Sequence, residues 1–247
     1  MLPTIFTITK RELKGYFGAP VAYVFIVIFL VLCGFFTMYV SRFYDAGQAD
    51  LRAFFVWPPW LCLFLVPAVA MRLWSEERRG GTIEILLTLP VTVGQAVIGK
   101  FLAAWLFIAI AFALTFPLVL TVAYLGQPDY GPIVTGYVGC LLLAGGYLAI
   151  GSFTSALTRS QVISFILAVV CCLFFVLAGW PPVTDALVKV FGPTSAIVNF
   201  IAALGFMPHY ESIQRGVLDT RDLLYYVSLI IFMLCATSAV LNSRKAS

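Results

Sequence analysis

The stretch from Gly94 to Phe101, GQAVIGKF, is where the residue types and spacing come nearest to a phosphate-binding site. The phosphate-binding loop of ATPases reads G-x-x-x-x-G-K followed by Ser or Thr. Gly94, Gly99 and Lys100 fall into register with that pattern, and Phe101 replaces the hydroxyl that would bind magnesium. The match alone therefore leaves ATP binding open.

The residues around this stretch favour a helix over a phosphate-binding loop. Such a loop needs a buried strand before it, and the preceding sequence supplies none. Thr92 followed by Gln95 fits a capping box, which predicts a helix that starts at about residue 93 and continues through Lys100. Backbone N–H groups inside a helix are already paired and cannot surround a phosphate. We therefore expect no nucleotide, metal or other cofactor site in this chain.

Other reactive side chains give no catalytic pattern. The single histidine, His209, has no matching partner motif, so we interpret it as a surface or packing residue. The six cysteines lie within apolar stretches and are interpreted as small packing residues. The apolar stretches contain no ionisable group of the kind that ion-coupled transporters keep at membrane depth. The chain is therefore expected not to be an enzyme and to lack a driving force of its own.

Composition identifies the class of protein. Of 247 residues, 62% are hydrophobic and only 11% are charged, against about 25% charged in a soluble domain. Six long stretches without charge are each long enough for a helix across a hydrocarbon core of about 30 Å. We predict an all-α membrane protein with six spans in a single permease domain, residues 1–247. The spans are expected at 20–41, 53–71, 101–125, 133–157, 160–180 and 223–243.

The distribution of Lys and Arg predicts the orientation. Ten of the 15 fall in segments that share a side with the N-terminus, and five fall on the other side. By the positive-inside rule both termini face the cytoplasm. The same asymmetry explains the net charge of +4, so we expect no nucleic-acid partner.

The segments between the spans include three further predicted elements. Residues 2–17 combine apolar positions with Lys10, Arg11 and Lys14, which indicates an interfacial helix against membrane lipid or, alternatively, a disordered basic leader. In the cytoplasmic loop 72–100, the charged run SEERR precedes a short apolar helix from Ile83 to Leu89, which must be covered by lipid, by its own bundle or by a partner protein; the charged run favours a partner. In the outer segment 181–222, the apolar stretch 196–204 predicts a re-entrant or interfacial helix, and the charges that follow it, Asp222 included, predict a solvated face.

Two features of the spans leave alternatives open. Pro67 breaks the regular hydrogen bonding of the second span, as a hinge or as a fixed kink. A stripe of small residues from Gly136 to Gly151 permits close helix packing, either within the chain, which we favour, or across a dimer.

Three stretches of the chain resemble a known family. The run PAVAMRLWSEERRGGTIEILLTLPVTVGQAVIGKF, residues 67–101, resembles the inner loop of type 2 ABC transporter permeases. Residues 8–36 and 210–230 are similar to the beginning and the end of the same family, and together they suggest its gliding-motility branch. The resemblance implies a permease subunit of the bacterial inner membrane that pairs with a second copy or a sister permease.

The resemblance also implies a partner that supplies the energy. Two cytoplasmic ATPase subunits, which bind ATP and Mg, would dock under the loop 72–100 and drive transport through its short coupling helix. The contact residues implied by position are Glu76, Glu77, Arg78, Arg79, Gly81, Thr82, Glu84, Leu86 and Leu87, with Arg159 in a second, smaller contact. The alternative function is a non-transporting membrane anchor or signalling subunit that holds a cytoplasmic ATPase through the same loop.

Overall fold

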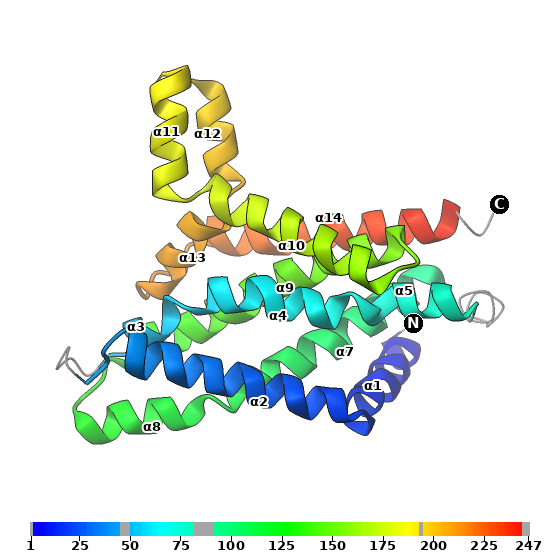
Figure 1. The fold of residues 1–247 in the computed structure, drawn as a ribbon, viewed down its shortest axis with the longest axis horizontal. Helices are drawn as coiled ribbons and strands as arrows, with labels where there is room; N and C mark the ends of the chain where they lie inside the picture. Colours follow the sequence, from blue (N-terminus) through cyan, green and yellow to red (C-terminus); the bar gives the residue numbers. More distant parts are fainter. Residues whose placement is uncertain (1, 45–49, 82–90, 193–194, 244–247) are drawn as a thin grey trace.

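The computed structural model describes residues 2–44, 50–81, 91–192 and 195–243. These residues form helices and no β-strand, and six of the helical segments are long and apolar enough to cross a membrane. The all-α, six-span architecture is therefore confirmed. The first and last described residues lie at the same end of the bundle, together with α5, and we call this the inner end (Figure 1).

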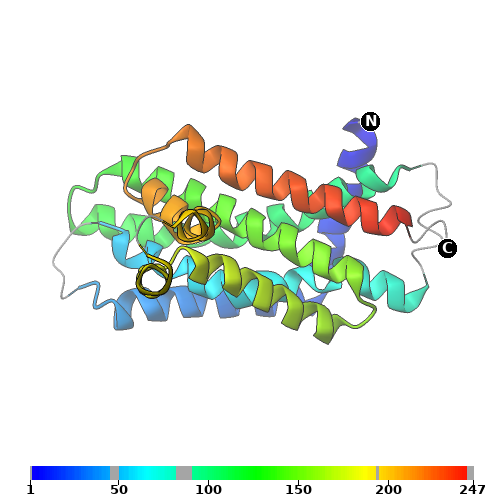
Figure 2. The same ribbon diagram turned by 90° about the horizontal axis from the view of Figure 1, so that it is seen from above.

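Helix α1 and the first three spans make up the first half of the chain. Helix α1 (Leu2–Gly18) runs across the inner end, transverse to the spans (Figure 2). Span 1 is α2 (Pro20–Phe35) with a π-helical continuation, Phe36–Val40. After the short α3 (Arg52–Phe55), span 2 consists of α4 (Pro58–Ala70) and α5 (Arg72–Gly80). Span 3 is α7 (Val93–Ala113) followed by α8 (Phe116–Leu125).

The second half of the chain surrounds one central helix. Span 4 is α9 (Tyr130–Leu157), span 5 is α10 (Gln161–Ala178), and span 6 is α14 (Thr220–Ser243). Helix α9 packs against α4, α5, α7, α10, α14 and the outer helix α13 (Phe206–Gln214), so most of the buried core lies along it. The described parts of the predicted loop 72–100 are mostly helical, because α5 extends to Gly80 and α7 begins at Val93.

Small residues let the neighbours of α9 approach closely, and they do so within the chain. A Cβ added to Gly136 would lie 2.6 Å from the ring of Phe55, and one added to Gly151 would lie 2.4 Å from Cβ of Ala70. Cys140 and Ala144, on the same stripe, are completely buried. The favoured interpretation, packing within the chain, is therefore confirmed for this stripe.

The segment between spans 5 and 6 forms a hairpin and a further helix. Helices α11 (Pro181–Phe191) and α12 (Ala196–Ala203) project sideways from the bundle as a hairpin (Figures 1 and 2). The stretch 196–204 is therefore helical, as predicted, but it does not cover the outer end of the spans. That position belongs to α13 (Phe206–Gln214), whose Tyr210 is buried and donates a hydrogen bond to the carbonyl of Phe55 at 2.7 Å. Burial raises the pKa of the Tyr210 hydroxyl, so it remains a donor.

Candidate functional site at the inner end of the bundle

Span 2 is interrupted at Met71, and a neighbouring helix caps the break. Pro67 has no N–H and disfavours regular helix around it, and the chain turns at Met71 before α5 begins. The first N–H groups of a helix have no partner within that helix. Here the Oγ of Ser155, on α9, accepts from the N–H groups of Trp74 and Ser75 at 3.1 Å each and donates to the carbonyl of Met71 at 3.0 Å. Helix α5 therefore starts on a side chain of α9.

Two further contacts fix α5 to the inner end of α9. The indole N–H of Trp74, which is buried, donates to the Oγ of Ser152 at 3.1 Å. One turn later the Arg78 guanidinium donates to the carbonyl of Ala156 at 2.5 Å. Helices α5 and α9 therefore form one body at this end.

On the other side of α5, a buried lysine joins three helices. The Lys100 side chain, on α7, is only 6% exposed, and its Nζ lies 2.7 Å from the Glu77 carboxylate on α5 and 3.4 Å from the Glu12 carboxylate on α1. It also lies 5.4 Å from the centre of the Trp74 ring. The sequence placed Lys100 at the edge of span 3 but gave no indication of these partners, because they are 88 and 23 residues away. We call Lys100, Glu77 and Glu12 the inner ion cluster.

The predicted ATPase contacts differ in how far they are exposed. Glu76, Arg79, Gly81 and Arg159 are exposed at the inner end, and Glu76 forms an ion pair with Arg72 at 2.9 Å. Glu77 and Arg78 are half-buried and bind the bundle through Lys100 and Ala156. Gly81 ends α5 in the left-handed conformation, with φ of 70°. Four predicted contacts lie outside the described residues: Thr82, Glu84, Leu86 and Leu87. The predicted coupling helix 83–89 also lies outside them.

The stretch that resembles a phosphate-binding loop is helical. Thr92 Oγ1 accepts from the N–H of Gln95, and the Gln95 side chain accepts from the N–H of Thr92, which completes the predicted capping box. Gly94, Gly99 and Lys100 all lie within α7. The backbone of α7 therefore does not have the geometry of a phosphate-binding loop.

A polar pair at the outer end was not found from the sequence. His209 Nδ1 lies 2.7 Å from Oδ1 of Asp222, and the His209 ring stacks on Tyr225 at a centroid distance of 4.1 Å. Asp222 is only 7% exposed, so its assignment to a solvated face was wrong. The pair joins α13 to the start of α14. His209 and Asp222 are 13 residues apart with a turn between them, so helical periodicity does not predict their contact.

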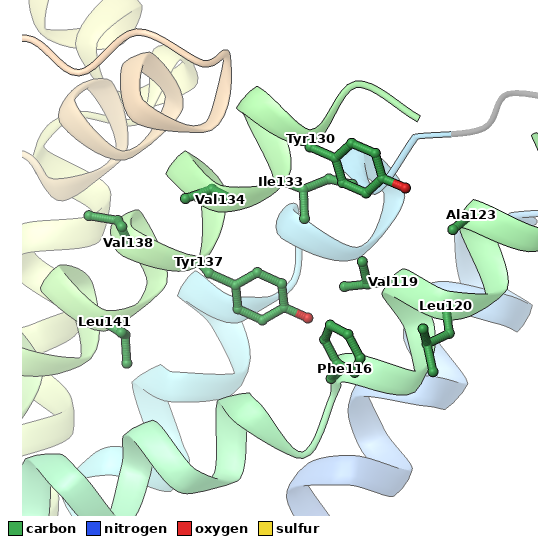
Figure 3. Close-up of a pocket in the computed structure, with 10 residues that line it drawn as sticks. All are labelled: Phe116, Val119, Leu120, Ala123, Tyr130, Ile133, Val134, Tyr137, Val138 and Leu141. Carbon is green, nitrogen blue, oxygen red and sulfur yellow. The ribbon is translucent and has the colours of Figure 1, made fainter. Parts of the chain in front are cut away.

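An apolar groove of about 470 Å³ lies between α8 and α9 (Figure 3). Span 3 breaks at Leu114 and Thr115, and α8 restarts with Pro117 in its first turn. The groove contains two hydroxyl groups, those of Tyr130 and Tyr137, and Tyr137 is paired with Thr115 at 2.8 Å. No charged residue lines the groove, so it can hold an apolar group but provides no charged partner for an ionic ligand.

The described residues thus form a six-span helical bundle in which α7 has no phosphate-binding loop. Residues 60–243 match the model of the ABC-2 family transporter protein, so the chain belongs to that family. It is a multi-pass membrane subunit of an ABC transporter. The predicted type 2 ABC permease is thereby confirmed, while the gliding-motility branch stays a prediction. No curated protein matches the chain.

Proposed function

We propose that this chain is the permease subunit that moves a substrate across the bacterial inner membrane, driven by ATP hydrolysis in separate subunits that dock at the inner end. ATP and Mg would bind in those partners, and a second copy or a sister permease would complete the pathway. The anchoring of α5 supports this proposal most directly. Ser155, Ser152 and Ala156 fix α5 to the central helix, so a force applied at residues 81–92 would reach α9.

The exposed charges at the inner end provide a test of docking. Arg79 and Arg159 are both exposed there, on α5 and on the connection between α9 and α10. Reversing each charge, Arg79→Glu and Arg159→Glu, is expected to weaken binding of the ATPase by about tenfold per site, equivalent to about 1.4 kcal/mol. Affinity would be measured on the purified permease in nanodiscs, with the ATPase encoded in a neighbouring reading frame.

The matched control is Arg221→Glu, which reverses an exposed arginine at the opposite end of the bundle. It should leave the affinity unchanged. Equal binding by all three variants would show that the ATPase docks elsewhere. Reconstituted vesicles then separate transport from anchoring: ATPase activity that moves none of the substrates tested would favour the non-transporting anchor.

A further inference from the structure

Two groups of helices, which we call bodies, meet at the inner end. Helix α1 is packed closely on α7: a Cβ added to Gly99 would lie 2.7 Å from Cγ2 of Ile8, and Thr9 Oγ1 donates to the carbonyl of Gly99 at 3.2 Å. About two turns further along both helices, Tyr16 stacks on Phe107 with ring centroids 5.2 Å apart. Burial, with a smaller effect of the Glu12 charge, raises the pKa of the Tyr16 hydroxyl, so this contact stays neutral. We call α1 with α7 the first body, and α5 with the inner end of α9 the second. Further along its length α7 also packs on α9, where the Trp105 indole donates to the carbonyl of Leu141 at 2.9 Å.

The inner ion cluster joins these bodies through residues of α1, α5 and α7. Glu77 lies in α5, before the segment 81–92, and Lys100 lies in α7, after it, so their 2.7 Å contact joins the two helices that flank the segment. Glu12 lies in α1, within the same body as Lys100, and its carboxylate is 3.4 Å from the ammonium. The Lys100 ammonium thus faces two carboxylates. The nearer one, Glu77, belongs to the other body, and the more distant one, Glu12, belongs to the same body as Lys100.

A buried ammonium cannot leave its partner without a replacement. Removing one member of a buried ion pair is strongly destabilising, because the remaining charge stays in a low-dielectric site. If the second body moved away from the first, Lys100 would lose Glu77. Glu12 is already close enough to accept the ammonium with a small change of rotamer, so the separation would leave no buried lysine unpaired.

On the basis of the function proposed above, we propose that Lys100 is a positioning residue that exchanges carboxylate partners during transport. Glu77 is the partner in the arrangement described here, in which the bodies are joined. Glu12 is the partner when the ATPase displaces α5. Glu77 therefore stabilises the joined arrangement and Glu12 the separated one. In a purely structural cluster, both carboxylates would stabilise the joined arrangement.

The test uses the two neutral substitutions Glu12→Gln and Glu77→Gln, each of which keeps one carboxylate beside Lys100. Spin-labelled residues at Arg11, exposed on α1, and at Val162, exposed on α10 beside the second body, report the separation of the bodies. Distances would be measured by pulsed electron resonance on the complex with its ATPase, without nucleotide and after trapping with ATP and vanadate.

The variants are expected to shift the populations in opposite directions. Glu12→Gln should favour the joined arrangement about tenfold, even after trapping, and Glu77→Gln should favour the separated one about tenfold without nucleotide. Glu211→Gln, the same change on a carboxylate of α13 that is ion-paired with Arg215 away from the cluster, should do neither. Shifts in the same direction, or none, would overturn the exchange while leaving the proposed function intact. If the wild-type distance does not respond to nucleotide, coupling through the inner end fails, and the exchange fails with it.

Discussion

Replacing Gly151 with leucine is expected to destabilise the bundle by at least about 3 kcal/mol. Gly151 lies in α9 where α4 crosses it, and an added Cβ would lie 2.4 Å from Cβ of Ala70. Neither atom is the flexible end of a side chain, so relief would require the two helices to separate. That separation would also pull on the break at Met71, directly after Ala70, and so on the start of α5.

The expected loss can be measured as a fall of about 10 °C in the unfolding temperature of the detergent-solubilised protein. The matched control is Gly34→Leu, the same change in span 1, where an added Cβ meets nothing within 4 Å. It should leave the unfolding temperature unchanged or slightly higher, since leucine is the better helix former. If both variants melted like the wild type, α4 and α9 could not be packed as closely as described.

The features that follow from local sequence could be predicted well. Hydrocarbon thickness requires long uncharged helices, so composition alone led to six spans, and the capping box at Thr92 fixed the beginning of α7. The small-residue stripe on α9 likewise indicated close packing. Each of these depends on residues within a few turns of one another, where helical periodicity determines which side chains are neighbours.

Contacts between distant parts of the chain were not predictable in this way. Lys100 appeared to mark the edge of a span, but it is buried between carboxylates from α1 and α5. His209 appeared to lack a partner, because the turn before α14 that brings Asp222 beside it has no sequence signature. Ser155 belongs to an uncharged span, and its role depends on a helix start 80 residues away. In each case the missing information is how the helices pack, not what each helix is.

The second large effect is expected at Ser155. Its Oγ satisfies two N–H groups at the start of α5 and donates to the carbonyl of Met71, and Ser155 is fully buried. Ser155→Ala would leave the two donors without this acceptor in a site closed to water, at a cost of about 2 to 4 kcal/mol. Because the groups affected are the ones that hold α5 against α9, we expect the permease to insert and fold but to transmit motion poorly.

The measurement is the stimulation of the ATPase by the permease in nanodiscs, which should fall at least fivefold for Ser155→Ala. Ser152→Ala removes only the bond to the Trp74 indole, so its effect should be smaller. Ser228→Ala, at an exposed position on α14 where the hydroxyl bonds only its own helix turn, serves as the control. The order Ser155, Ser152, Ser228 follows from the number of contacts that each hydroxyl makes between α5 and α9. An equal loss of ATPase stimulation for Ser228→Ala would mean that stimulation responds to any change in the spans. Full stimulation by Ser155→Ala would show that motion is not transmitted through the first turn of α5.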